Sequence, residues 1–237
     1  MFEVAREWHR DAIALRYRGD LVALADYYGT DKWNTHWYAE VYEEHFRDWR
    51  ERPLNILEIG VGGFDNPHSG GASLRMWKAY FRNSQIHGID IHDKRPQEER
   101  RIRVWRGSQV DGEFMSGVFA AIGRVDILID DGSHANAHVI ETFQHCFPLL
   151  ADGGIYVIED VQTSYWPEYG GHVRTFDDPG TTMGFFKRLT DGLNHTEIPE
   201  GSRAPDSFDT TVRAVHFYHN LVILEKGDGT RPRRVLG

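Results

Sequence analysis

The chain has 237 residues, of which 40% are hydrophobic, and a formal net charge of −9 at pH 7. This charge argues against a nucleic-acid surface, because neutralising phosphates requires clustered Lys and Arg. The single cysteine excludes an intrachain disulfide, and no apolar run reaches the length of about 18 residues that is typical of a membrane span. We therefore expect a cytoplasmic protein with neither nucleic acid nor membrane as its partner.

The N-terminal part of the chain is expected to be helical. Residues 1–52 would form a helical segment packed on the main domain, which would span residues 53–237. Asp20 is placed to cap a helix that Gly29 closes, and a longer helix is expected from Asn34 onward. The polar loop GTDKWNTHW between these helices is either an ordinary cap or a segment that folds over an active site.

Strand patterns alternate with helix patterns through the rest of the chain. Strands are expected over residues 55–59, 85–91, 101–106, 125–130, 155–159, 211–217 and 221–226. Helices are expected over residues 73–81, with Ser73 as N-cap, and over 111–122, 136–150 and 183–193. This alternation predicts an α/β fold, namely a Rossmann-like, doubly wound, seven-stranded sheet with its last strand antiparallel, preceded by N-terminal helices.

The first loop that could bind a ligand follows the strand at 55–59, in the sequence LEIGVGG. Gly60 and Gly62 would let the backbone approach a ligand closely. The dinucleotide fingerprint G-x-G-x-x-G fails here, because Asp65 stands where the third glycine is needed. Glu58 would repel a pyrophosphate, but its carboxylate suits a cationic or hydroxyl-bearing ligand.

The next two strands also end in polar residues. Asp90 stands where an acidic side chain accepts hydrogen bonds from a ribose diol, although a carboxylate there can also simply cap a helix. Ser108 and Gln109 follow the third strand, where the topology would place the edge of an adenine.

Four carboxylates follow two strands that should be neighbours in the sheet. Asp130 and Asp131 end the run VDILIDDGSH, and Glu159 and Asp160 end the run IYVIED. Four such charges at adjacent strand ends would repel one another without a cation, and oxygen ligands suit Mg²⁺ or Mn²⁺. The alternative is that one Asp of each pair caps a helix or binds loop amides. His134 shares the loop and is either structural or a general base.

The motifs LEIGVGG, GID, IDDGSH and VIEDVQTSYWPEYGG together resemble class I S-adenosylmethionine-dependent methyltransferases. More narrowly, they are similar to the metal-dependent sugar O-methyltransferases of macrolide and aromatic polyketide antibiotic biosynthesis. The resemblance implies that His134 is the base, that Asp131, Glu159 and Asp160 bind Mg²⁺, and that the cofactor is bound by Glu58, Gly60, Gly62, Asp90, Ser108 and Gln109. Asp130 would either face the cofactor or hold the loop.

The resemblance also implies an activity and its partners. The chain would transfer a methyl group from S-adenosylmethionine to a sugar hydroxyl of a small-molecule glycoside. Independently of the resemblance, we expect the protein to be a homo-oligomer. Tyr165, Trp166 and Tyr169 would cover an apolar aglycone, unless they only pin a surface loop. The alternatives are a methyltransferase of another small-molecule hydroxyl and an NAD-dependent sugar-modifying enzyme.

Overall fold

The computed structural model describes residues 9–199 and 201–230, which fall into two compact units. The first unit ends at Ser108, and the second begins at Gln109. The predicted division into residues 1–52 and 53–237 stays a prediction, and its first eight and last seven residues lie outside the described part of the chain.

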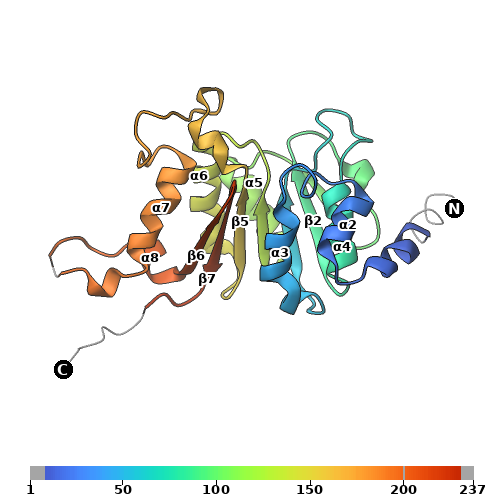
Figure 1. Ribbon diagram of the computed structural model, residues 1–237, viewed down its shortest axis with the longest axis horizontal. Helices are drawn as coiled ribbons and strands as arrows, with labels where there is room; N and C mark the ends of the chain where they lie inside the picture. Colours follow the sequence, from blue (N-terminus) through green and yellow to red (C-terminus); the bar gives the residue numbers. More distant parts are fainter. Residues whose placement is uncertain (1–8, 200, 231–237) are drawn as a thin grey trace. The chain divides into compact units, whose positions relative to one another are not determined.

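The first unit holds three parallel strands with β2 paired to both β1 and β3. Helices α2 and α4 pack against each other beside these strands (Figure 1). The elements of this unit are η1 (Leu15–Tyr17), α2 (Leu21–Tyr28), α3 (Tyr38–Phe46), η2 (Arg47–Trp49), β1 (Asn55–Ile59), α4 (Ala72–Tyr80), β2 (Gln85–Asp90), η3 (Arg95–Gln97) and β3 (Ile102–Arg106).

The ends of α2 agree with the prediction from the sequence, whereas the start of α3 does not. The Asp20 side chain accepts a hydrogen bond from the backbone N–H of Ala23, and Gly29 closes α2 in the left-handed conformation. The prediction of a helix from Asn34 was wrong at its start, because Asn34 and Trp37 both have positive φ. Helix α3 therefore begins only at Tyr38.

The predicted N-cap of α4 was also wrong. Gly71 occupies the cap position with φ +73°, and no side chain caps this helix. Ser73 lies inside the first turn, and its hydroxyl donates to Glu58 Oε2 at 2.8 Å. Gly71 suits the cap because a left-handed backbone carries little steric cost without a Cβ.

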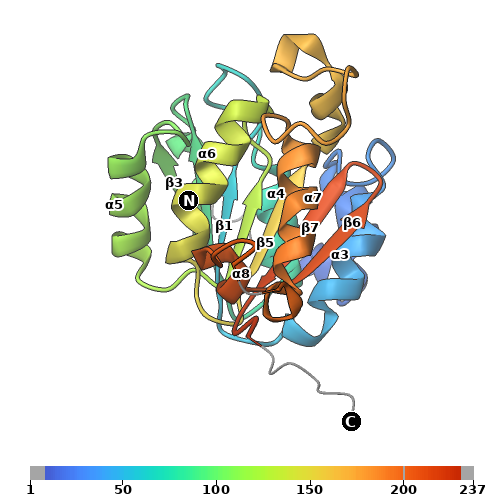
Figure 2. The same cartoon turned by 90° about the vertical axis from the view of Figure 1, so that its left-hand side faces the viewer.

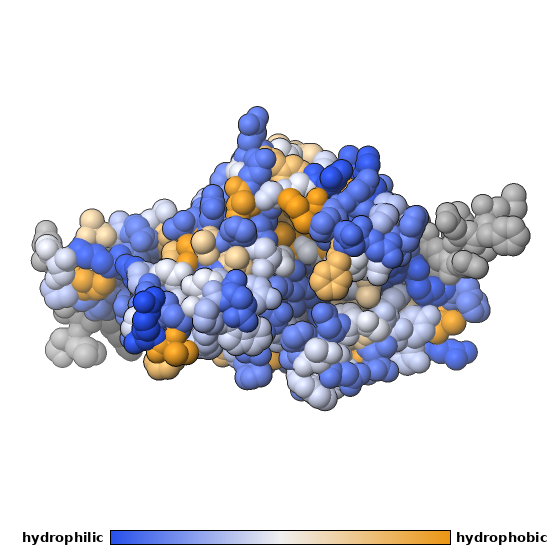
Figure 3. Space-filling model, turned by 90° about the horizontal axis from the view of Figure 1, so that it is seen from above, coloured by the Kyte–Doolittle hydropathy of each residue, from blue (hydrophilic) through white to orange (hydrophobic). Residues whose placement is uncertain are grey.

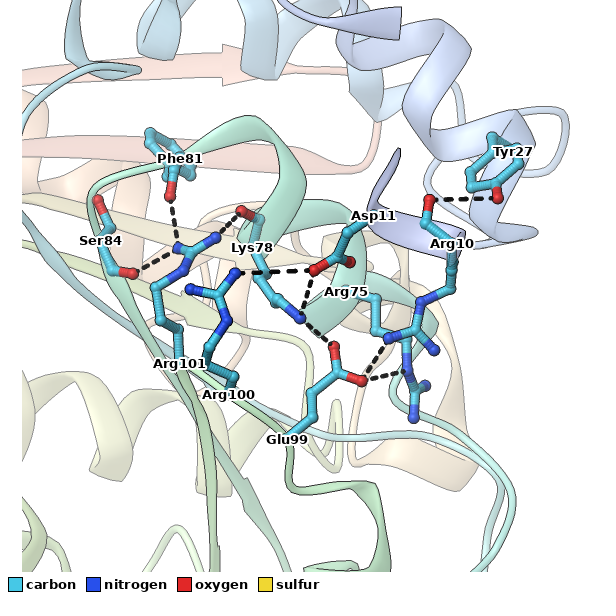
Figure 4. Close-up of polar contacts among 10 residues, drawn as sticks. All are labelled: Arg10, Asp11, Tyr27, Arg75, Lys78, Phe81, Ser84, Glu99, Arg100 and Arg101. Atoms are coloured by element: carbon cyan, nitrogen blue, oxygen red, sulfur yellow. Dashed lines mark hydrogen bonds and ion pairs between the residues drawn. The ribbon is translucent and has the colours of Figure 1, made fainter. Parts of the chain in front are cut away.

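A network of charged residues joins the N-terminal helical residues to α4 and to the turn before β3 (Figure 4). Lys78, which is buried on α4, lies 2.8 Å from Glu99 and 3.1 Å from Asp11. Arg10 pairs with the same Glu99 carboxylate. Arg101 donates to the carbonyls of Lys78 and Phe81 at the end of α4, where helix carbonyls lack partners, and to the carbonyl of Ser84 in the turn that follows.

The second unit contains the remaining four strands, with helices α6, α7 and α8 together on one face of the sheet (Figures 1 and 2). Its elements are α5 (Gly112–Ile122), β4 (Ile127–Asp130), α6 (Asn136–Cys146), η4 (Phe147–Leu149), β5 (Ile155–Glu159), η5 (Val161–Tyr165), η6 (Pro167–Tyr169), α7 (Thr182–Gly192), η7 (His195–Glu197), α8 (Ser207–Thr211), β6 (Val212–Tyr218) and β7 (Leu221–Lys226). Helix α6 ends earlier than predicted, because Pro148 lacks the N–H that an α-helix needs.

The strand order confirms the predicted sheet. Strands β4 and β5 are parallel, whereas β7 runs antiparallel to both β5 and β6. The strand order is β3-β2-β1 within the first unit and β4-β5-β7-β6 within the second. Every residue of β4 and β5 is buried, as expected for strands covered on both faces.

Among the described residues, no helix is long and apolar enough to cross a membrane.

Candidate active site

The carboxyl ends of β4 and β5 bring the predicted metal and catalytic residues of the second unit together. Asp130 is the last residue of β4 and pairs in parallel register with Ile158, next to the end of β5. Asp131 and Asp160 are therefore the first residues beyond two adjacent parallel strands. Ligands of parallel α/β sheets bind at this edge.

Asp131, His134 and Asp160 offer side-chain atoms that all lie within 4.8 Å of one another. His134 Nε2 is 3.8 Å from Asp131 Oδ1 and 3.7 Å from Asp160 Oδ2. Both distances exceed those of hydrogen bonds, so the imidazole faces the two carboxylates without bonding directly to either. All three side chains are partly accessible, as groups that meet a ligand must be.

The backbone at this cluster is conformationally unusual. His134 has φ +56° and Asp160 has φ +53°, a region that residues with a Cβ seldom occupy. Two hydrogen bonds stabilise this conformation at Asp160. The backbone N–H and the hydroxyl of Thr163 donate to the carbonyl of Asp160, at 3.1 and 2.9 Å. Strained residues of this kind concentrate at functional sites, so the geometry is consistent with a working site here.

Glu159, the third predicted metal residue, is the last residue of β5 and is buried. One of its carboxylate oxygens lies within 4.8 Å of an Asp131 carboxylate oxygen. Asp131 thus lies close to both of the other predicted metal residues.

Asp130 is buried and bonds to Gln109, and it is not one of the three clustered residues. Gln109 Nε2 donates to Asp130 Oδ1 at 3.1 Å and to Thr142 Oγ1 at 3.0 Å. Gln109 Oε1 accepts the backbone N–H of Ser133 at 2.8 Å, so this side chain ties the residues after β3 to the DDGSH loop. Burial raises the pKa of Asp130 to about 7, although the hydrogen bond from Gln109 acts in the opposite direction.

In the first unit, Glu58 forms a buried ion pair that the sequence did not reveal. Lys32 Nζ lies 3.1 Å from Glu58 Oε1, and both side chains are 0% exposed. The GTDK turn delivers this lysine: Thr30 Oγ1 accepts the N–H of Lys32, whose carbonyl accepts the N–H groups of Tyr38 and Ala39. A polar loop has no periodicity that marks one residue as buried, so Lys32 could be recognised only as a loop residue.

The glycine loop and Asp90 form one structure in the first unit. Gly60 and Gly62 have φ of +96° and +77°, which glycine adopts readily. Asp90 Oδ2 accepts the N–H of Val61 at 3.1 Å, and Oδ1 accepts the N–H of His92 at 2.8 Å. Each carboxylate oxygen can accept a further bond, so Asp90 can hold this loop and still bind a hydroxyl group. Ser108, also predicted to bind the cofactor, is half-buried at the end of this unit.

The three aromatic residues predicted to contact the substrate lie on the short helical turns after β5. Tyr165 and Trp166 are exposed, and Tyr169 is partly so. The rings of Trp166 and Tyr169 have centroids 6.0 Å apart. These rings therefore offer an accessible apolar surface on the second unit.

The central part of the chain is similar to a known protein family. Residues 57–161 match the family model described as a methyltransferase domain. This match confirms the resemblance to methyltransferases that the sequence motifs indicated.

Particular methyltransferases match over most of the chain. MycE, a methyltransferase of the mycinamycin biosynthetic pathway solved in complex with Mg and SAH, superposes with a TM-score of 0.87 at 44% sequence identity. That match covers 91% of this chain and 55% of MycE, and it confirms the Rossmann-like fold.

Two curated relatives give the same result. The 8-demethyl-8-alpha-L-rhamnosyl tetracenomycin-C 2'-O-methyltransferase of Streptomyces olivaceus is 47% identical over 87% of this chain and 54% of its own length. The mycinamicin VI 2''-O-methyltransferase of Micromonospora griseorubida is 45% identical over 88% of this chain and 53% of its own length. The chain spans about half the length of these relatives.

Proposed function

We propose that this chain catalyses the S-adenosylmethionine-dependent, Mg²⁺-dependent O-methylation of a sugar hydroxyl on a glycosylated macrolide or aromatic polyketide. The observation that carries the proposal is the Asp131–His134–Asp160 cluster, at the ends of β4 and β5 in a chain 47% identical to a rhamnosyl O-methyltransferase. The names of the relatives support both the reaction and the class of substrate.

The donor groups present fit a divalent ion. Asp131, Glu159 and Asp160 would hold it through carboxylate oxygens, the ligands that Mg²⁺ prefers and that Mn²⁺ also accepts. The side chains of Asp131 and Asp160 are partly accessible to a substrate, whereas Glu159 is buried.

His134 would act as the general base. When bound, S-adenosylmethionine supplies an activated methyl group and the divalent ion supplies Lewis acidity. His134 Nε2 faces Asp131 and Asp160 and is therefore placed to accept the proton of a hydroxyl held between them. General bases of this kind typically contribute about 10²- to 10⁴-fold to the rate.

The cofactor would be held by polar groups at several strand ends. In the first unit these are Glu58, Gly60, Gly62, Asp90 and Ser108. In the second unit they are Gln109 and Asp130, whose side chains are hydrogen-bonded to each other. Tyr165, Trp166 and Tyr169 would contact the apolar aglycone, and a homo-oligomer in the cytoplasm stays our expectation.

Methyl transfer to mycinamicin VI and to rhamnosyl tetracenomycin substrates, with and without EDTA, tests the proposal. We expect release of S-adenosylhomocysteine to stop in excess EDTA and to return with Mg²⁺ or Mn²⁺. Full turnover in EDTA would exclude the metal role. Thermal stabilisation by NAD⁺ but not by S-adenosylhomocysteine would favour the alternative of an NAD-dependent enzyme.

The base is tested by His134→Ala, with His138→Ala as the matched control. His138 is exposed in the first turn of α6, just after the loop that carries His134, and its Nδ1 bonds to Ser133 Oγ rather than facing the carboxylates. We expect His134→Ala to lower kcat by about 10²-fold or more, with the binding of S-adenosylhomocysteine unchanged. A near-normal kcat in this variant would show that another group takes the proton.

A further inference from the structure

We propose that Asn136 is a positioning residue that fixes the segment after β5 as a preformed wall of the substrate site. We call residues 161–171 the aromatic loop; it carries Tyr165, Trp166 and Tyr169. We call the hydrogen bonds by which Asn136 holds this loop the clamp. The role of the loop toward a glycoside rests on the proposed function, whereas the clamp itself rests on contacts within the second unit.

The amide of Asn136 joins three segments of the chain. Its Nδ2 donates to the carbonyl of Thr163 at 3.1 Å and to the carbonyl of Tyr169 at 2.9 Å. Its Oδ1 accepts the backbone N–H of Thr182, at the start of α7, at 2.6 Å. Both amide hydrogens and the carbonyl oxygen are therefore used, and the side chain is only 1% exposed. A buried group with every bond satisfied holds its partners rigidly.

A second, partly buried contact holds the same loop against α7. Ser164 Oγ accepts the backbone N–H of Met183 at 2.9 Å, and the Ser164 carbonyl accepts the N–H of His172 at 3.0 Å. Gly171 lies so close to the chain that an added Cβ would meet the Thr163 carbonyl oxygen at 2.3 Å. The two ends of the aromatic loop are thus packed tightly together.

The loop presents its rings outward while its backbone is held inward. Trp166 is 43% exposed, although its carbonyl accepts the N–H of Gly171 at 2.9 Å inside the loop. On the face seen from above in Figure 3, apolar side chains form small groups within a mostly hydrophilic surface. An apolar surface on a fixed backbone favours binding, because little conformational entropy is lost when a ligand arrives.

The clamp also reaches the proposed metal site without taking part in the chemistry. Thr163, whose carbonyl is held by Asn136, donates two hydrogen bonds to the carbonyl of Asp160. Asn136 itself bonds to none of the clustered carboxylates or to His134. Its effect on the reaction must therefore act through the aromatic loop, which makes it a positioning residue.

Asn136→Asp is the most direct test. The aspartate keeps the shape of the side chain and the acceptor for Thr182. Its second oxygen replaces the donating amide nitrogen, so it would repel the carbonyl oxygens of Thr163 and Tyr169. We expect amide hydrogen exchange in peptides covering residues 163–172 to accelerate at least tenfold, with exchange in β7 unchanged. We also expect KM for the glycoside to rise about tenfold, with kcat and the affinity for S-adenosylhomocysteine within twofold of wild type.

Ser164→Ala and Asn83→Asp make the test decisive. Ser164→Ala removes only the acceptor for Met183, so we expect a smaller acceleration in the same peptides even if Asn136→Asp does not fold. Asn83→Asp removes one exposed hydrogen bond to the Glu51 carbonyl and should change nothing.

The outcomes separate the two proposals. Unchanged exchange in both loop variants would overturn the clamp, and faster exchange with an unchanged KM would overturn its role toward the glycoside. A wild-type enzyme that binds S-adenosylhomocysteine but methylates no glycoside would contradict the proposed function, and the exchange data would still decide the clamp.

Discussion

The buried ion pair between Lys32 and Glu58 determines that Glu58 can be ionised inside the protein. Glu58 is fully buried at the end of β1, and it receives the Ser73 hydroxyl as well as the Lys32 ammonium. An unpaired carboxylate in that position would be costly, because burial removes water from the charge. The lysine therefore allows an ionised carboxylate to lie beside the glycine loop.

We expect Lys32→Met to lower the free energy of unfolding by about 3–5 kcal/mol, the usual effect of leaving one member of a buried ion pair alone. The double variant Lys32→Met/Glu58→Gln should recover part of that loss, since no buried charge is then left unpaired. Urea unfolding of both variants measures the effect.

Arg18→Met is the matched control, because Arg18 pairs with Glu51 at 3.3 Å where both side chains are more than half exposed. Its loss should change the unfolding free energy by less than about 1 kcal/mol. Equal effects of the two single variants would contradict the special role of the buried pair.

At the scale of elements, side-chain caps mark where several helices begin. Asp111 accepts the backbone N–H of Phe114 at 3.0 Å and starts α5, as Asp20 starts α2. Helix α2 begins where Asp20 was predicted to cap it, and α5 begins one residue later than predicted, because Asp111 is its cap rather than its first residue. The start of α4 escaped prediction because its cap is a glycine whose left-handed backbone leaves no side-chain signal.

We expect Asp111→Ala to destabilise the protein by about 1 kcal/mol, the usual value of an N-cap hydrogen bond. Glu113→Ala, in the first turn of the same helix, should cost only a few tenths of a kcal/mol, roughly the size of its interaction with the helix dipole. Thermal unfolding of the pair measures the difference, and equal losses would show that charge rather than capping stabilises this end.

At the scale of the whole molecule, buried ionisable groups set how stability depends on pH. Burial lowers the pKa of His87 on β2 to about 4, with a smaller contribution from Arg103. Neither ring nitrogen of His87 has a hydrogen-bond partner among the described residues. Burial alone would raise the pKa of Glu99, but hydrogen bonds from Lys78 and Arg10 lower it below its usual value.

The signs of these shifts define two pH windows. The unfolded chain, with a His pKa of about 6.5, binds a proton at His87 before the folded protein does. Stability from His87 is therefore complete above pH 6.5 and is lost as the pH falls toward 4. Glu99 contributes above its ordinary carboxyl pKa and loses its contribution only at lower pH.

We expect the unfolding free energy of the wild type to fall between pH 6.5 and 5, and His87→Leu to reduce that slope. The change should be less than about 1.4 kcal/mol per pH unit, the limit for one proton, because the half-buried ring is partly screened. Urea titrations at several pH values measure the slope. His68→Leu, at an exposed position, should leave it unchanged, and an unchanged slope in His87→Leu would exclude His87 as its source.

Much of the fold and of the candidate site followed from local patterns. The apolar run ending in DDGSH predicted both the buried strand β4 and the polar edge beyond it, because strand burial and strand ends leave their mark on consecutive residues. Asp131 and Asp160 could be placed together since parallel neighbouring strands end at one edge of a sheet. The seven strands and the final hairpin were also predicted from local sequence patterns.

Other features depended on contacts between residues far apart in the chain. Asp130 and Asp131 are identical neighbours, yet one is buried against Gln109 while the other faces His134. Lys32 meets Glu58, and Asn136 meets Thr163, Tyr169 and Thr182, across segments that no periodicity connects. Local sequence specifies which groups are polar and where strands end. Only packing in three dimensions selects their partners, because burial makes an unpaired polar group costly and so enforces the pairs that form.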